Sequence, residues 1–162
     1  MLLCFALLCF ALLCFSSLQF YQHLLEELQA LRQGFYTDFI RVSSYEGTQS
    51  TGNVNIKGGL DKEMLQGKDV ILVEDIVDTG TTLSYLLPVL EETASPKSVQ
   101  ICSLLEKRLD APPKVQAKYI GFTVPNHFII GYGLDYEELY RDVRDIWVIS
   151  QKGIEFDRST LH

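Results

Sequence analysis

The stretch VILVEDIVDTGTTL, residues 70–83, decides the fold. Within residues 69–73, Asp69 is followed by a continuous run of four apolar, largely β-branched side chains. Such a run is typical of a strand buried on both faces of a parallel sheet. The run ends in Glu74 and Asp75, and open α/β sheets bind ligands at the carboxyl ends of their strands. Because two adjacent carboxylates are costly to bury unless cations or hydroxyl groups meet them, we predict a binding site at this strand end.

The turn that follows predicts a phosphate site. It leads into a predicted helix over residues 81–93 and consists of Asp78, Thr79, Gly80, Thr81 and Thr82. The glycine allows close backbone approach, the threonine hydroxyls donate, and the first amides of the helix point outward with the positive end of its dipole. Together the carboxylates and the turn predict a sugar phosphate as ligand. The plainer interpretation, a solvated strand end beside a helix cap, explains each part alone but not their order and spacing.

Strand and helix patterns alternate along the rest of the chain, which predicts a doubly wound parallel α/β sheet with helices on its faces. We expect a first helix capped by Ser16 or Ser17 at its start and by Gly34 at its end. The other predicted elements are strands at 35–42, 54–57, 99–105, 119–122, 129–132 and 146–149, a loop at 43–53, a turn at 58–59 and a helical turn at 60–66.

Composition limits the function classes. The chain has 162 residues, 47% of them hydrophobic, which suits one compact domain. The formal net charge of -7 argues against nucleic-acid binding by charge. Cys102 lies in an apolar stretch and is expected in the core, while His23, on the first helix without a ligand partner nearby, is expected at the surface or satisfied.

The first fifteen residues, MLLCFALLCFALLCF, differ from the rest of the chain, so we divide it into an apolar pentapeptide repeat (1–15) and a domain (16–162). A period of five fits neither a helix nor a strand. The run is shorter than a membrane helix requires, so no membrane association is expected. Three interpretations stay open: an uncleaved or artefactual repeat, a secretory signal, and a buried strand, for which residues 12–15 are the candidate.

The turn at 78–82 with the preceding carboxylates resembles the ribose-phosphate motif of the type I phosphoribosyltransferases. The sequences SLLEKR (103–108), YIGFTVPNHFIIGYGLDYEELYRD (119–142) and DFIRVSSYEGTQSTG (38–52) are similar to the hypoxanthine-guanine branch of that family. The resemblance covers roughly residues 16–157. It implies the type I phosphoribosyltransferase fold, a parallel sheet flanked by helices. Part of the N-terminal core, and part of the hood that covers the base in this family, would be missing here.

The resemblance implies a role for each matched residue. Glu74 and Asp75 would meet the ribose hydroxyls and Mg²⁺, and Asp78 would be the acid/base partner of the purine N7. The 5′-phosphate would be held by Asp78, Thr79, Gly80, Thr81 and Thr82.

The base and the pyrophosphate are matched further along the chain. Lys107 would donate to the 6-oxo group, Phe128 would stack on the base, and Ile129 would contact its edge through the main chain. The remaining matches are Asp135, near a second metal, the purine and the pyrophosphate; Arg141, at the pyrophosphate; and Ser44 and Tyr45, in a mobile loop that closes over the reaction.

The implied function is purine salvage: hypoxanthine or guanine reacts with phosphoribosyl pyrophosphate to give IMP or GMP and pyrophosphate. The resemblance also implies a homodimer or homotetramer in the cytoplasm. The chain departs from the family at Phe15, Ser16 and Ser17, which stand where the family has a Lys-Gly-Gly type pyrophosphate loop. The alternative function is therefore a catalytically weak or inactive homologue that serves as a nucleotide-binding or dimerising module.

Overall fold

The computed structural model describes residues 8–12, 18–30, 32, 34–44, 54–57 and 61–156. Its main sheet has five strands in the order β2-β1-β5-β6-β7, and every neighbouring pair is parallel. The elements are β1 (Leu8–Leu12), α1 (Leu18–Ala30), β2 (Phe35–Phe39), β3 (Arg41–Ser44), β4 (Val54–Lys57), α2 (Lys62–Leu65), β5 (Asp69–Val77), α3 (Thr81–Ala94), β6 (Ser98–Arg108), β7 (Tyr119–Pro125), β8 (Ile129–Ile130), β9 (Trp147–Val148) and α4 (Gln151–Ile154).

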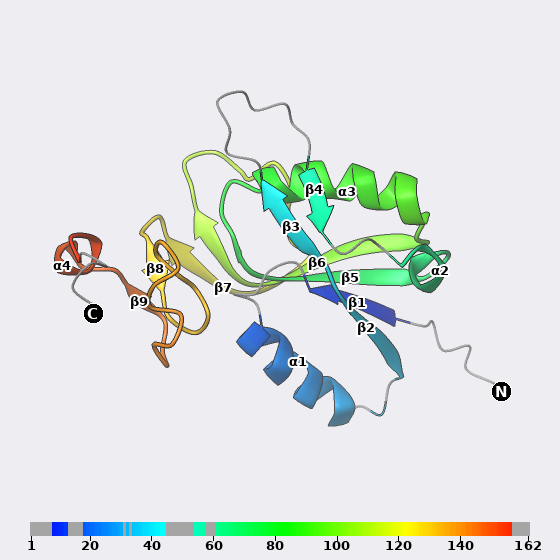
Figure 1. Cartoon of the computed structure of the whole chain (residues 1–162), viewed down its shortest axis with the longest axis horizontal. Helices are drawn as coiled ribbons and strands as arrows, with labels where there is room; N and C mark the ends of the chain where they lie inside the picture. Colours follow the sequence, from blue (N-terminus) through cyan, green and yellow to red (C-terminus); the bar gives the residue numbers. More distant parts are fainter. Residues whose placement is uncertain are drawn as a thin grey trace.

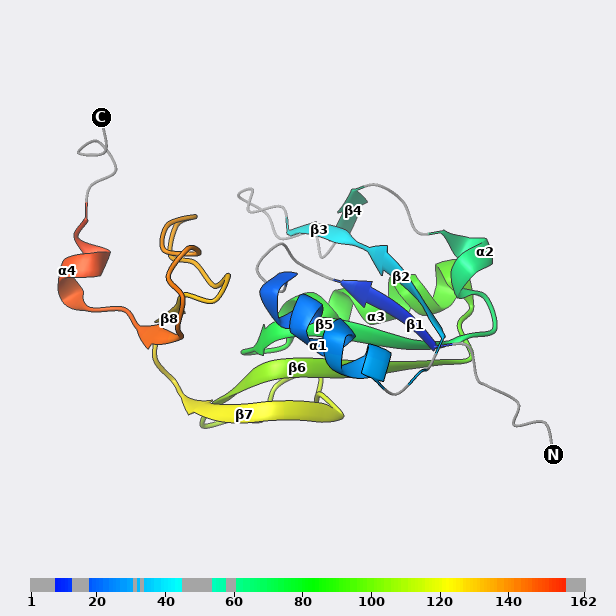
Figure 2. The same cartoon turned by 90° about the horizontal axis from the view of Figure 1, so that it is seen from below.

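The sheet lies between two helices, with α3 on one face and α1 on the other (Figure 1 and Figure 2). The expected parallel sheet flanked by helices is therefore confirmed. The two-stranded antiparallel pair β3-β4 lies on the α3 side of the sheet. Residues 126–156, which carry β8, β9 and α4 and which we call the hood, extend beyond the carboxyl end of β7.

Alternating side chains of β5 build the core on both faces. Val70 and Leu72 pack in a cluster with Leu86 of α3, while Val73 packs with Tyr21 of α1 on the opposite face. Val77 belongs to the α3 cluster again, so the alternation changes phase across residues 74–75. This change of phase coincides with the carboxylates at the end of the strand.

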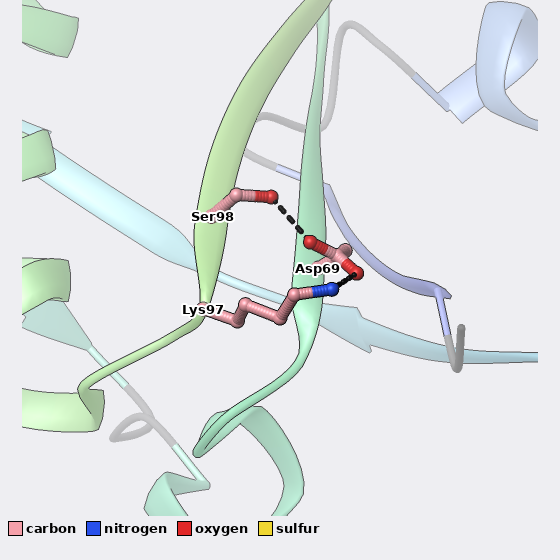
Figure 3. Close-up of polar contacts among 3 residues, drawn as sticks. All are labelled: Asp69, Lys97 and Ser98. Carbon is pink, nitrogen blue, oxygen red and sulfur yellow. Dashed lines mark hydrogen bonds and ion pairs between the residues drawn. The ribbon is translucent and has the colours of Figure 1, made fainter.

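The amino-terminal ends of β5 and β6 are tied together by a polar cluster, shown in Figure 3. The carboxylate of Asp69 accepts hydrogen bonds from the Lys97 ammonium at 2.9 Å and from the Ser98 hydroxyl at 2.7 Å. These bonds hold the pKa of Asp69 below its ordinary value, with the Lys97 bond as the largest cause. The cluster fixes the register of two central strands at the end opposite the predicted site.

The structure corrects several sequence-based expectations near the amino terminus. The strand of the repeat is Leu8–Leu12, so the candidate at 12–15 overlaps it only at Leu12, and residues 13–15 lie outside the described residues. The left-handed residue after α1 is Arg32 (φ 53°), not Gly34. The expected caps Ser16 and Ser17 also lie outside the described residues.

Three predicted strands also differ from expectation. The strand at 35–42 is interrupted at the buried Ile40, after which β3 runs antiparallel to β4 instead of joining the main sheet. The strands expected at 129–132 and 146–149 shrink to β8 and β9, an antiparallel pair in the hood. Ser43 and Ser44, expected in the loop at 43–53, are instead the end of β3. The other predicted elements are confirmed, whereas the turn at 58–59 and most of the rest of that loop lie outside the described residues.

The hood contains an unusual backbone. Six of the ten residues 131–140 have positive φ angles: Gly131, Tyr132, Gly133, Glu137, Glu138 and Tyr140. Four of these are not glycine, and a residue with a Cβ in the left-handed region carries a cost of roughly 1–2 kcal/mol. Specific contacts must therefore hold this segment in place.

Within the described residues, no helix is long and apolar enough to cross a membrane.

Candidate active site

The carboxyl end of β5 buries two adjacent carboxyl groups. Glu74 is 8% exposed and Asp75 is 6% exposed, and the Ile76 amide donates to the Asp75 carboxylate at 2.7 Å. Burial raises the pKa of Glu74 well above its ordinary value, and the neighbouring charge of Asp75 adds to the rise. The site thus holds carboxylates at the sheet edge where α/β folds bind their ligands.

The turn between β5 and α3 has the backbone that the sequence predicts. Gly80 precedes the first residue of α3 with a left-handed φ of 70°. A Cβ on it would lie 2.9 Å from the Val115 amide nitrogen, so only glycine fits between this turn and the segment at 114–115. The Lys114 amide donates to the Thr79 carbonyl at 2.9 Å, and this bond holds the turn against the segment at 114–115.

The threonines of this turn are available to a ligand. The hydroxyls of Thr79 and Thr81 lie 3.0 Å apart, and Thr82 is exposed at the start of α3. The free amides of the first turn of a helix, together with its dipole, favour a phosphate dianion. The geometry therefore suits the predicted 5′-phosphate.

Lys107, near the carboxyl end of β6, forms an ion pair with Asp78, which directly follows the carboxyl end of β5. The Lys107 nitrogen lies 2.7 Å from an Asp78 carboxylate oxygen and 5.8 Å from the centroid of the Phe128 ring. The Lys107 side chain is only 11% exposed, whereas that of Asp78 is 45% exposed. A buried ammonium needs a partner, and Asp78 supplies it.

A pocket of about 260 Å³ opens between the sheet edge and the hood. Its lining combines carboxylates, one lysine and apolar side chains: Asp75, Ile76, Asp78, Lys107, Phe128, Ile129, Leu134 and Asp135. Six of these residues are among the predicted site residues. Ile76 and Leu134 are additions that the sequence analysis missed, and only their positions beside Asp75 and Asp135 could have pointed to them.

The hood side of the pocket is held by contacts among its own residues. The Phe128 ring meets the Tyr136 ring edge to face, with centroids 5.1 Å apart. Asp135 forms an ion pair with Arg141 at 2.7 Å, and it also accepts from the Glu138 amide. Tyr136 therefore supports the aromatic wall of the pocket.

Some predicted site residues do not line this pocket. Glu74 is buried behind it, the residues 79–82 surround the start of α3, and Arg141 reaches the pocket only through Asp135. The backbone of Ser44 ends β3, and Tyr45 lies outside the described residues.

The pocket carboxylates fit a magnesium ion held largely by substrate. Within the described part of the chain, no three His, Cys, Asp or Glu side chains gather as a ready metal cluster. Mg²⁺ usually takes one or two protein carboxylates, with waters and substrate phosphates completing its shell. Asp75 and Asp135 both line the pocket, although Asp135 already contacts Arg141 and Glu138. Both carboxylates are therefore candidates to hold the ion.

Comparisons with known proteins show the family to which the chain belongs. The phosphoribosyl transferase domain family matches residues 15–137. The human hypoxanthine-guanine phosphoribosyltransferase is 40% identical over 141 residues, which cover 83% of this chain and 64% of the human protein. The enzyme of the same name from Mus spretus is 40% identical and is covered to 65%. The chain thus spans slightly less than two thirds of these relatives.

Solved structures give the same result. The hypoxanthine phosphoribosyltransferase of Staphylococcus aureus superposes with a TM-score of 0.81 at 34% identity, covering 94% of this chain and 80% of that one. The Trypanosoma cruzi enzyme in complex with its product IMP gives a TM-score of 0.79 at 36% identity, covering 90% and 76%. The family match at residues 15–137 includes the turn at 78–82 and all eight residues that line the pocket. The chain belongs to the phosphoribosyltransferase family, in its hypoxanthine-guanine branch.

Proposed function

We propose that the protein is a purine-salvage phosphoribosyltransferase. It converts hypoxanthine and guanine, with phosphoribosyl pyrophosphate, into IMP and GMP and releases pyrophosphate. The proposal is supported by the family membership and by a pocket that joins base-contacting residues to a phosphate turn.

The observation that carries the proposal is the pairing of Lys107 with Asp78 at 2.7 Å inside the pocket. The pair presents one donor and one acceptor side by side. A 6-oxopurine offers an acceptor at O6 beside the neighbouring N7, so Lys107 donates to O6 while Asp78 accepts the N7 proton. Adenine carries a 6-amino donor at the same place, which would face the Lys107 ammonium, and this mismatch selects against it.

The purine lies against the Phe128 ring, with the Ile129 main chain at its edge. Phe128 is 49% exposed although it is a large apolar side chain, and Tyr136 supports it from the side. An aromatic base covering this ring removes apolar surface from water and gains the stacking geometry that rings prefer.

The reaction forms one bond and breaks another. The purine N9 attacks C1 of the ribose, and the bond from C1 to the pyrophosphate oxygen breaks, so that pyrophosphate leaves with the electron pair. The proton on the imidazole ring of the base passes from N7 to Asp78. Positive charge builds on the sugar, and the carboxylates of Glu74 and Asp75 hold the ribose hydroxyls and offset that charge.

The remaining site residues position the substrate. The turn at 78–82 binds the 5′-phosphate, and Arg141 and Asp135 lie on the pyrophosphate side of the pocket. Glu74, Asp75 and Asp135 would hold Mg²⁺, which would supply positive charge beside the leaving pyrophosphate. Ser44 and Tyr45 belong to the loop that excludes water from the reacting sugar.

We also propose that the protein acts as a homodimer or homotetramer in the cytoplasm. Large apolar side chains are exposed on the described surface, including Phe122 at 67% and Trp147 at 59%, and self-association would cover such groups. Analytical ultracentrifugation of the purified chain tests this assembly, and a monomer at micromolar concentration contradicts it.

The function is tested by incubating the purified protein with Mg²⁺, phosphoribosyl pyrophosphate and either hypoxanthine, guanine or adenine. We expect IMP and GMP to form and AMP to be absent. If no IMP forms while GMP still stabilises the fold, the protein is a nucleotide-binding module and the enzymatic proposal is wrong.

Two variants test the roles of the ion pair. Asp78→Asn should lower kcat on the order of 100-fold, as expected for loss of general acid/base help, with a smaller effect on GMP affinity. Lys107→Gln should weaken the preference for 6-oxopurines over adenine. An equal loss of turnover and GMP binding in Asp78→Asn would contradict its assigned role.

A further inference from the structure

A contact between α1 and the hood stands outside the assigned site. His23 Nδ1 of α1 is hydrogen-bonded to the Tyr132 hydroxyl of the hood, and the two rings lie 5.7 Å apart between centroids at 33°. The residues are 109 positions apart in the sequence. Figure 1 and Figure 2 both show the amino-terminal end of α1 directed towards the hood. The contact therefore joins α1, which packs on the main sheet, to the hood, which lines the pocket.

Tyr132 is the centre of a strained turn. Gly131, Tyr132 and Gly133 have φ angles of 86°, 54° and 96°, so three consecutive residues are left-handed. The tyrosine is the costly member, because its Cβ opposes this backbone by roughly 1–2 kcal/mol. The Tyr132 amide donates to the Val143 carbonyl at 2.7 Å, and the side chain is held by His23.

The turn leads directly into the pocket. Leu134 is 6% exposed and packs with Leu105, and Asp135 follows it in the lining. Arg141 donates to the Gly133 carbonyl at 2.8 Å and forms its ion pair with Asp135. A displacement of the turn would therefore move both Asp135 and Arg141.

We propose that His23 is a positioning residue: through Tyr132 it fixes the turn at 131–135, and thereby the Asp135–Arg141 pair on the pyrophosphate side of the pocket. The inference rests on the proposed function for what that pair binds. It assigns a role in substrate placement to a histidine that touches no substrate. It also links α1, on one face of the main sheet, to the hood wall of the pocket.

Four variants test the proposal: His23→Ala, Tyr132→Phe, their double variant, and Gln22→Ala as a control. Gln22 lies on the same helix, and its side chain donates to Glu26 rather than to the hood. A lost hydrogen bond of ordinary strength predicts a KM for phosphoribosyl pyrophosphate that rises about 3- to 10-fold in either single variant. The double variant should be no worse than either single one. The KM for hypoxanthine should rise less than the KM for phosphoribosyl pyrophosphate. Gln22→Ala should leave both KM values unchanged, and His23→Gln should restore part of the loss.

Hydrogen exchange separates this proposal from the proposed function. In His23→Ala the amides of Tyr132, Gly133 and Leu134 should exchange about 3- to 10-fold faster than in the wild type, with or without any turnover. Unchanged exchange at these amides overturns the proposal even in an active enzyme. Multiplying effects in the double variant, or an equal rise of both KM values, would also overturn it.

Discussion

The buried carboxyl group of Glu74 is costly to the stability of the ligand-free protein, and a bound ligand would offset that cost. Its carboxyl group is 8% exposed beside a second acidic residue, and burial raises its pKa well above the ordinary value. Removing the charge should therefore relieve a cost that the ligand-free protein carries. Such positions are typical of binding sites, because the ligand supplies the compensation that the fold does not.

We predict that Glu74→Gln stabilises the ligand-free protein by about 1 kcal/mol, within the range measured for buried polar groups that lack full compensation. The same variant should lose part of the stabilisation by GMP, since the ribose hydroxyls lose a charged acceptor. Urea unfolding with and without GMP measures both effects. Glu92→Gln, on the exposed side of α3, is the control and should change neither.

At the residue scale, sequence reasoning found what lies close together along the chain and missed what only folding brings together. Glu74, Asp75 and the turn at 78–82 are neighbours in the sequence, so their chemistry could be inferred from order and spacing. The ion pair of Lys107 and Asp78 spans 29 positions and depends on the register of β5 against β6. His23 has no partner within its own segment, which is why it was expected to be an ordinary surface residue.

At the scale of elements, the phosphate turn depends on one glycine for two separate reasons. Gly80 has a left-handed backbone, and a Cβ there would also meet the Val115 backbone at 2.9 Å. Gly67 has the same φ of 70° with nothing within 4 Å of the corresponding Cβ. The two glycines therefore separate backbone strain from steric conflict.

We predict that Gly67→Ala costs about 1 kcal/mol of stability, as expected for backbone strain alone, and leaves the KM for phosphoribosyl pyrophosphate unchanged. Gly80→Ala should cost more and raise that KM, because either the turn or the segment at 114–115 must move. Thermal unfolding and steady-state kinetics check the pair. Equal effects of the two substitutions would show that the contact with Val115 is unimportant.

The cluster that ties β5 to β6 makes the stability of the sheet sensitive to acid. The bonds from Lys97 and Ser98 lower the pKa of Asp69, so its contribution is present above the unfolded-state pKa, near 3.8, and is lost as the pH falls through the folded-state value. Asp69→Asn should therefore be less stable than the wild type near pH 6 and should converge with it in strong acid. Asp110→Asn, at an exposed loop position, is the control. A difference that persists undiminished below pH 3 would contradict this account.

The element boundaries show where pattern reasoning stops. β5, β6 and α3 carry strong periodicity and were predicted, although β5 and β6 run longer than their apolar runs. The segments at 129–132 and 146–149 have strand composition, but in the hood they meet only each other. Their pairing was not predictable, since a short apolar run does not indicate which sheet it joins.

At the scale of the whole molecule, the sheet is assembled around a strand that no pattern announces. β1 pairs with β2 on one side and with β5 on the other, so it is an interior strand. Its residues come from a stretch with a period of five, which matches neither regular structure. Parallel neighbours on both sides supply the pairing that the local sequence does not specify.

The origin of β1 in a repeat has a further consequence. The strand reads LCFAL at residues 8–12, and residues 3–7 read LCFAL as well. Moving the chain by one repeat places identical side chains at every position of the strand, so neither its partners nor its faces distinguish the two arrangements. The connection to α1 would then grow from residues 13–17 to residues 8–17. Doubling a loop costs only about 0.6 kcal/mol, which corresponds to a ratio of roughly three to one.

Deleting residues 3–7 should therefore remove the second arrangement and leave the strand sequence and the unfolding midpoint unchanged. A single NMR resonance set for β1 in the deletion variant, in place of two in the full chain, would demonstrate the exchange, whereas one set in both would exclude it. The repeat thus offers two identical five-residue sequences, at 3–7 and 8–12, for one interior position of the sheet.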